Sequence, residues 1–162
     1  MREDCPPLHP PTPRNIATIA GMRLKCRVGD EAGNQAAEAL VIEDDADARR
    51  LVVSCLKRLG LRVLEAATGA EACALMDRSV PAVICLDLRL PDADGLALCE
   101  RIRASARLRD VPVVVITAQA RAIDRAQAEV AGADEYVIKP FRLHALSESI
   151  RELLGLSAVG AS

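Results

Sequence analysis

Two kinds of apolar pattern alternate five times between Glu38 and Leu154, and few folds accommodate such an alternation. Short apolar runs typical of buried strands cover residues 39–42, 62–66, 82–88, 111–117 and 136–139. Apolar residues that recur every three or four positions follow these runs, within residues 48–59, 70–78, 95–102, 122–130 and 143–154. Strands that alternate with helices of this length predict right-handed crossovers and a parallel sheet covered on both faces. We therefore predict a doubly wound α/β domain with five parallel strands.

Local signals predict the ends and the buried faces of these helices. The buried face of the first helix is expected to consist of Ala48, Leu51, Val52, Cys55, Leu56 and Leu59, with Gly60 as the stop. Thr68 is the expected N-cap of the second helix, which would include Ala70, Cys73 and Ala74. The helix over residues 122–130 is rich in alanine, and Gly132 is expected to end it.

The chain divides into a folded part and two tails. Five of the nine prolines fall in the first thirteen positions, so we expect a flexible N-terminal tail over residues 1–37. Whether residues 1–21 are translated stays open, because Met22 could also be a start site. The folded domain is expected over residues 38–155, followed by a short C-terminal tail at 156–162. A length of 162 residues suits one such domain.

Composition narrows the classes of partner. The net charge is −2, and Tyr136 and Phe141 are the only aromatic residues, so neither a basic face nor stacking rings favour nucleic-acid binding. No apolar run is long enough for a membrane helix or resembles a signal peptide, which predicts a cytoplasmic protein. The six cysteines form no C-x-x-C pair, and Cys55, Cys73, Cys85 and Cys99 lie in apolar patterns, so we expect these four to be free core thiols.

Polar residues gather where the predicted strands end. Glu43, Asp44 and Asp45 follow the first strand, Asp87 follows the third, Thr117 ends the fourth and Lys139 ends the fifth. Ligands of open parallel sheets bind beyond the carboxyl ends of the strands, so these groups are expected to meet at one edge. Crowded carboxylates repel one another unless a cation lies among them, and hard oxygen ligands suit Mg²⁺. With a lysine for a second positive charge, the pattern indicates a phosphoryl-transfer site.

Four motifs in this order resemble the receiver domain of two-component response regulators: V-I-E-D-D-A-D-A-R at 41–49, I-C-L-D-L-R-L-P-D-A-D-G at 84–95, V-V-V-I-T-A at 113–118 and E-Y-V-I-K-P-F at 135–141. Each motif alone is weak evidence for this family, but the four motifs in this order and at this spacing are specific to it. The resemblance spans the folded part, residues 38 to about 155. It implies a flavodoxin-like fold with the strand order 2-1-3-4-5.

The resemblance also assigns the acidic residues. It implies that Asp87 is the phospho-accepting aspartate, and that Glu43 and Asp44 are the acidic pair that binds Mg²⁺ together with Asp87. The backbone carbonyl of Arg89 would be the remaining protein ligand. Asp45 is then surplus to the metal site, and we interpret it as a first-turn acid that favours the helix dipole.

Three further residues take roles from the same resemblance. Thr117 would be the switch threonine, Tyr136 the switch aromatic that rotates inward with it, and Lys139 the lysine that contacts the phosphoryl group, followed by a cis bond to Pro140. Three of the site residues also have a plain structural alternative. Asp87 could cap a helix, Thr117 could be an ordinary strand residue, and Lys139 could pair with Asp134 or Glu135.

The implied function is a stand-alone phospho-accepting response regulator and not an enzyme. Its partners would be a sensor histidine kinase or histidine phosphotransfer protein and an unidentified target protein, with Mg²⁺ as cofactor. One alternative is a pseudo-receiver that docks without phosphorylation. Another, a haloacid dehalogenase-type hydrolase, needs a second aspartate at position 89, which is Arg89. The cognate kinase, the target, the lifetime of the phosphorylated state and the oligomeric state stay open.

Overall fold

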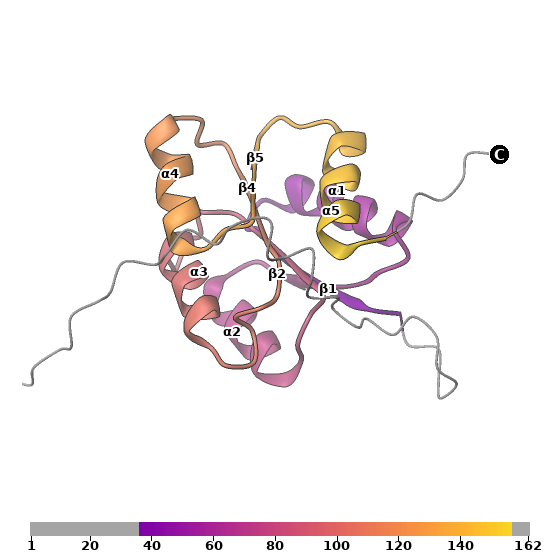
Figure 1. Ribbon diagram of the computed structural model, residues 1–162, viewed down its shortest axis with the longest axis horizontal. Coiled ribbons are helices and arrows are strands. Elements are labelled where there is room, and N and C mark those ends of the chain that lie inside the picture. Colours follow the sequence, from indigo (N-terminus) through magenta and orange to yellow (C-terminus); the bar gives the residue numbers. More distant parts are fainter. Residues whose placement is uncertain (1–35, 157–162) are drawn as a thin grey trace, which may run out of the picture. The chain divides into compact units, whose positions relative to one another are not determined.

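The computed structural model describes residues 36–156, in which five strands alternate with five helices (Figure 1). The strands are β1 (Glu38–Ile42), β2 (Arg62–Ala66), β3 (Val83–Leu86), β4 (Val113–Thr117) and β5 (Glu135–Ile138). The helices are α1 (Ala46–Arg58), α2 (Gly69–Arg78), α3 (Gly95–Ala104), α4 (Ala122–Ala131) and α5 (Leu143–Leu154). The predicted alternation is confirmed. Most of the expected flexible tails (residues 1–35 and 157–162), the alternative start at Met22, and Cys5 and Cys26 lie outside the described residues.

All five strands belong to one sheet, in the order β2-β1-β3-β4-β5, and every pairing is parallel. At the centre, Leu40 of β1 lies opposite Leu64 of β2 and Ile84 of β3. Both the doubly wound class and the predicted strand order are confirmed. The order in which strands are added reverses at β1: β2 lies on one side of it, and β3, β4 and β5 follow on the other. The carboxyl ends of β1 and β3 therefore lie at the position where sheets of this kind bind ligands.

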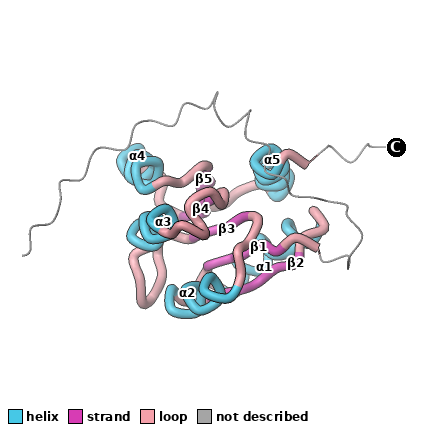
Figure 2. The backbone as a smooth tube through the Cα atoms, turned by 60° about the horizontal axis from the view of Figure 1, so that its bottom comes forward, coloured by secondary structure: helices cyan, strands magenta, loops and turns pink. Residues whose placement is uncertain are grey.

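Alternate residues of the central strands face opposite layers of helices. Leu40, Ile42, Ile84 and Leu86 pack against α2 and α3, whereas Ala39, Val41, Val83 and Cys85 pack against α1 and α5. Figures 1 and 2 show α1 and α5 on one side of the sheet and α2, α3 and α4 on the other. Because both faces are covered, β3 and β4 are buried throughout, and Thr117 at the end of β4 is their one polar residue.

The predicted buried face of α1 needs correction, and so does the expectation that Cys73 of α2 is a core residue. Leu51 is 50% exposed, and Val53 takes its expected place in the core. Residues 51, 52 and 53 are all apolar, so periodicity alone could not identify the outward one. In α2 the buried side chains belong to Ala72 and Met76, while Cys73 is half-buried and Ala70 and Ala74 are exposed. Small residues occur all around this helix, which blurs its amphipathic pattern.

An N-cap and a glycine determine where α2 and α3 begin, next to the carboxyl ends of the strands. Thr68 caps α2 as predicted, by accepting a hydrogen bond from the amide of Glu71 at 3.1 Å. Gly95 opens α3, where a Cβ atom would lie 2.5 Å from Cα of Leu88 and 2.7 Å from the carbonyl oxygen of Asp87. Only glycine lets α3 approach the end of β3 this closely. Within residues 36–156, no helix combines the length and apolar character that crossing a bilayer requires.

Candidate functional site

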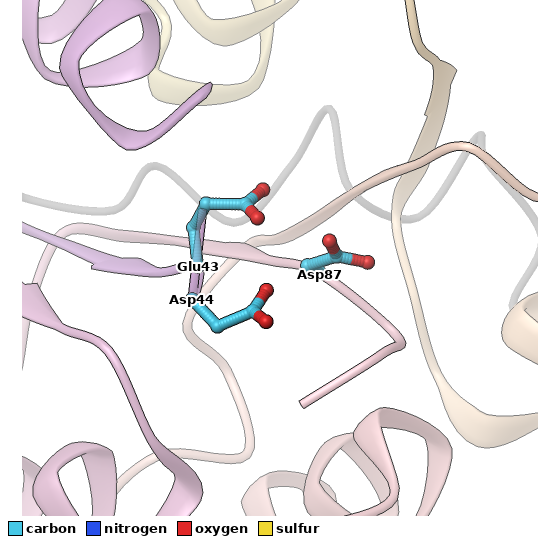
Figure 3. A group of neighbouring side chains, drawn as sticks. All are labelled: Glu43, Asp44 and Asp87. Atoms are coloured by element: carbon cyan, nitrogen blue, oxygen red, sulfur yellow. The ribbon is translucent and has the colours of Figure 1, made fainter. Parts of the chain in front are cut away.

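Three carboxylates meet where β1 and β3 end. Glu43 and Asp44 directly follow β1, and Asp87 directly follows β3. One oxygen from each lies within 4.8 Å of the other two. Figure 3 shows the three side chains grouped together. Glu43 and Asp87 are buried, whereas Asp44 is exposed. The predicted meeting of residues more than forty positions apart is therefore confirmed, because neighbouring parallel strands bring their carboxyl ends together.

Lys139 brings an ammonium group to these carboxylates from the end of β5. Its Nζ donates hydrogen bonds to Glu43 and, at 2.9 Å, to Oδ2 of Asp87. Its backbone amide donates to the carbonyl of Thr117 at 2.9 Å, which ties the lysine to the end of β4. Asp134, one of the alternative partners for Lys139, instead accepts from Nη2 of Arg103 at 2.7 Å. The bond from Lys139 to Pro140 is cis, as the family resemblance implies.

The charges of the site depend on one another. Burial raises the pKa of Glu43 from 4.5 to about 7, and the negative charge of Asp87 adds to the increase, although the hydrogen bond from Lys139 opposes it. Burial by itself would lower the pKa of Lys139, but its hydrogen bonds to Glu43 and Asp87 outweigh that effect and the pKa is raised. Lys139 therefore stays charged and compensates part of the negative charge of the site.

The acidic pair, Glu43 and Asp44, lies in the turn between β1 and α1, and residues of α1 and β2 form hydrogen bonds with this turn. Asp45 is the N-cap of α1, and its carboxylate accepts from the amide of Ala48 at 2.7 Å. The interpretation of Asp45 as a first-turn acid is thus corrected by one position, because it precedes the helix and caps it. Arg49 donates from Nη1 to the carbonyl of Glu43 at 2.8 Å. Sequence reasoning gave Arg49 no role, since nothing in the pattern indicates a hydrogen bond to a strand-end carbonyl.

Thr117 and Tyr136 lie on the neighbouring strands β4 and β5. Thr117 is fully buried, and its Oγ1 accepts from the amide of Gln119 at 3.3 Å. Tyr136 is buried as well, and its hydroxyl donates to the carbonyl of Gln119 at 2.8 Å. Tyr136 thus occupies the inward position in this structure. The backbone of Gln119 therefore connects Thr117 to Tyr136. The sequence did not predict this contact.

The loop after β3 is tied both to Asp87 and to α2. The amide of Arg89 donates to Oδ1 of Asp87 at 3.0 Å. Three residues further on, the carboxylate of Asp92 accepts from the amides of Gly69 at 2.7 Å and Ala70 at 3.0 Å, so it caps α2 from another element. These two hydrogen bonds hold the pKa of Asp92 below its ordinary value. Capping by a residue 23 positions away is not visible in local sequence patterns.

The donor set fits a small, hard cation. Carboxylate oxygens are the ligands that Mg²⁺ prefers, and three of them gather here within 4.8 Å. Asp44 is exposed, so the side of the group away from Lys139 is open to the water ligands that Mg²⁺ retains. A buried nucleophilic carboxylate beside an ammonium group is also a suitable acceptor for a phosphoryl group. The role of the Arg89 carbonyl stays a prediction.

Comparisons with known proteins identify the family. A family model described as the response regulator receiver domain matches residues 39–151. The chain is 35% identical over 121 residues to the probable transcriptional regulator ycf27 of Porphyra purpurea, covering 75% of this chain and 49% of that protein. It is 33% identical over 118 residues to the chemotaxis protein CheY1 of Helicobacter pylori, covering 72% of this chain and 95% of that protein. The chain thus spans about half the length of several relatives it matches.

Solved structures show the same fold. A putative response regulator from Chloroflexus aurantiacus matches with a TM-score of 0.71 and 28% identity, covering 74% of this chain and 98% of that one. The receiver domain of the sensor histidine kinase PA1611 from Pseudomonas aeruginosa, solved with a magnesium ion in its active site cleft, matches with a TM-score of 0.68, 32% identity and the same two coverages. By its family model, its relatives and its strand order, the chain belongs to the response regulator receiver domain family.

Proposed function

We propose that this chain takes a phosphoryl group from a phosphohistidine on a partner protein onto Asp87, in a reaction that depends on Mg²⁺. Phosphoryl acceptance is the general function of response regulator receiver domains, the family to which the chain belongs. One observation carries the assignment to Asp87. Its Oδ2 lies 2.9 Å from Nζ of Lys139, and the same carboxylate belongs to the group formed with Glu43 and Asp44.

Asp87 is the nucleophile of the transfer, and Lys139 stabilises the charge that develops. A carboxylate oxygen of Asp87 attacks phosphorus, and the new O–P bond forms as the P–N bond to the imidazole breaks and the nitrogen keeps the electron pair. Lys139 lies beside Asp87, where its ammonium group stabilises negative charge on the transferred oxygens. Mg²⁺, held by Glu43, Asp44, Asp87 and the carbonyl of Arg89, supplies further positive charge there. The chain is then a stoichiometric acceptor, not a turnover enzyme.

The signal passes through the neighbouring strands. Thr117 ends the strand next to Asp87, and Gln119 connects Thr117 to Tyr136 by the two hydrogen bonds described above. A phosphoryl group that draws the hydroxyl of Thr117 toward Asp87 competes with the bond from the Gln119 amide. The loop between β4 and α4 and the ring of Tyr136 then adjust together, which changes the surface offered to a target protein.

The partners follow from this chemistry. The donor is a sensor histidine kinase or a histidine phosphotransfer protein, and the output is contact with another protein. One relative carries the name DNA-binding dual master transcriptional regulator RpaA, from Synechocystis, and this chain covers 48% of it. The prediction that the present chain itself does not bind nucleic acid rests on its net charge of −2 and its two aromatic residues.

Replacing Asp87 tests the proposal directly. The variant Asp87→Asn keeps the shape of the side chain and is expected to lose all Mg²⁺-dependent labelling by acetyl phosphate or a phosphorylated kinase. The control is Asp45→Asn, because asparagine also caps helices and Asp45 lies outside the carboxylate group. The control is expected to be labelled like the wild type. Undiminished labelling of Asp87→Asn would refute the assignment, and wild-type protein that binds neither Mg²⁺ nor beryllofluoride would favour a pseudo-receiver.

A further inference from the structure

Arg49 joins three segments of the chain through one guanidinium group. Nη1 donates to the carbonyl of Glu43 at 2.8 Å and makes a marginal contact of 3.5 Å with the carbonyl of Asp44. Nε donates to Oε2 of Glu65 at 3.2 Å. Arg49 lies on α1, Glu65 lies on β2, and the two carbonyls belong to the acidic pair that follows β1. A residue that is not itself a carboxylate thus holds the backbone of two members of the site.

Besides Arg49, Lys139 contacts the Glu43 carboxylate and Asp45 joins the turn to α1, but few hydrogen bonds hold the backbone of the acidic pair itself. The amide of Glu43 continues the sheet by donating to the carbonyl of Ala66 at 3.0 Å, but the sheet ends there. The amide of Asp45 donates to Oε1 of Glu43 at 3.2 Å, which fixes one carboxylate from within the turn. The carbonyl of Glu43 points to Arg49 instead of a neighbouring strand. Loss of that hydrogen bond removes one restraint on the peptide between Glu43 and Asp44.

Arginine is suited to this position by its shape. Its guanidinium is planar and presents its donors in a fixed fork, so fixing Nε on one acceptor also fixes the direction of Nη1. Glu65 supplies that acceptor, and the side chain of Arg49 is only 21% exposed, which limits competition from water. A lysine would keep the charge but present one nitrogen to both acceptors.

We propose that Arg49 is a positioning residue for the acidic pair, and that Glu65 holds Arg49 in the orientation that this requires. The inference rests on the proposed function, in which Glu43 and Asp44 bind Mg²⁺. Mg²⁺ demands nearly ideal ligand geometry, so a turn that is loosened by rotation of one peptide binds it less tightly. Groups that orient metal ligands change affinity by about 10- to 100-fold when they are lost. Mg²⁺ binding therefore depends on an ion pair between α1 and β2 in which neither residue is a ligand.

Calorimetric Mg²⁺ titrations of the full chain measure this dependence. Arg49→Gln is expected to bind Mg²⁺ about tenfold more weakly than the wild type. Arg49→Lys, which keeps the charge, and Glu65→Gln, which keeps an acceptor without charge, are expected to lie between the two. In the metal-free protein, the amide of Asp45 is expected to exchange faster with solvent in Arg49→Gln, which gives a readout that needs no Mg²⁺.

A second ion pair that involves β2 provides the control. Nη1 of Arg62 lies 3.3 Å from Oε1 of Glu38. These are the first residues of β2 and β1 and pair with each other, whereas the acidic pair follows the last residue of β1. Arg62→Gln removes a β1–β2 ion pair far from the acidic pair and is expected to change the Mg²⁺ affinity by less than about twofold.

The outcomes separate this inference from the proposed function. If the wild type binds Mg²⁺ and all Arg49 and Glu65 variants bind it equally well, the positioning role is wrong while the proposed function stands. Loss of thermal stability with unchanged affinity also overturns the positioning role, because it is the signature of a purely structural ion pair. If the wild type binds no Mg²⁺, the proposed metal site fails and this inference fails with it. Should Arg49→Gln not fold, Glu65→Gln decides, since it leaves the guanidinium in place.

Discussion

Lys139 is the residue on which the electrostatics of the site depend most. The chain contains 3 lysines among its 21 basic residues, and one of them lies between Glu43 and Asp87. A compact ammonium can approach two carboxylates and a transferred oxygen at once, whereas a guanidinium is broader and directs its donors in a plane. Because its raised pKa keeps it charged, Lys139 offsets the repulsion within the carboxylate group.

Replacing Lys139 by arginine separates charge from shape. Lys139→Arg is expected to fold but to accept the phosphoryl group roughly 100-fold more slowly, the loss typical of one misplaced transition-state donor. The measurement is the rate of Mg²⁺-dependent labelling by acetyl phosphate. The control, Lys57→Arg, changes an exposed lysine near the end of α1 and is expected to have no effect. A normal rate for Lys139→Arg would show that charge alone suffices.

At the residue scale, the sequence predicted which side chains meet at the strand ends better than it predicted the hydrogen bonds that hold them. Glu43, Asp44, Asp87 and Lys139 meet as expected, because the position of a residue at a strand end follows from topology alone. Arg49 was not identified, because its partners are backbone carbonyls that every residue possesses. Where such hydrogen bonds form depends on the path of the folded chain.

At the scale of elements, strands and helix ends were predictable and helix faces less so. The boundaries of β2 and α5 are those predicted, and Gly132 ends α4 with a φ of 105°. β3 and β4 each begin later than predicted, at Val83 and Val113, since apolar residues of the preceding loops extend the apparent runs. An apolar run shows that a segment is buried without showing where its pairing starts.

The contact between the β3–α3 loop and α2 has a measurable pH dependence. The pKa of Asp92 is lowered in the folded protein by hydrogen bonds from the amides of Gly69 and Ala70. Its contribution to stability is therefore present above the unfolded value of 3.8 and lost as the pH falls through the lower folded value. Asp92→Asn is expected to be less stable than the wild type at about pH 7, and the difference is expected to shrink below about pH 4.

Denaturant unfolding at a series of pH values checks this expectation. The matched control is Asp77→Asn, which changes an exposed aspartate in the last turn of α2. The control is expected to follow the wild type at every pH. A difference between Asp92→Asn and the wild type that does not change with pH would mean that the charge of Asp92 plays no part in capping α2.

At the scale of the whole molecule, the alternation of five strands and five helices predicted the fold class, a parallel sheet covered on both faces. The strand order came from the family resemblance, since alternation alone allows several orders. The same topology brings Thr117, Tyr136 and the carboxylate group to neighbouring strands. In the proposed function, a phosphoryl group on Asp87 acts on Thr117, and Gln119 joins Thr117 to Tyr136 through the β4–α4 loop.

Tyr136 provides a reporter of that coupling. The chain has one tyrosine and no tryptophan, so its intrinsic emission comes from this position. Adding Mg²⁺ and beryllofluoride is expected to change the emission, because the hydroxyl of Tyr136 is bonded to the loop that follows Thr117. Asp87→Asn is expected to show no change. Constant emission from wild-type protein with bound beryllofluoride would count against the switch.

Mapping the phosphoryl group tests the account most directly. The full chain is labelled with acetyl phosphate, with and without Mg²⁺, and the modified residue is located by mass spectrometry of its peptides. We expect one phosphoryl group, on Asp87, and only when Mg²⁺ is present. A phosphoryl group on any other residue, or the same labelling without Mg²⁺, would contradict the proposed site.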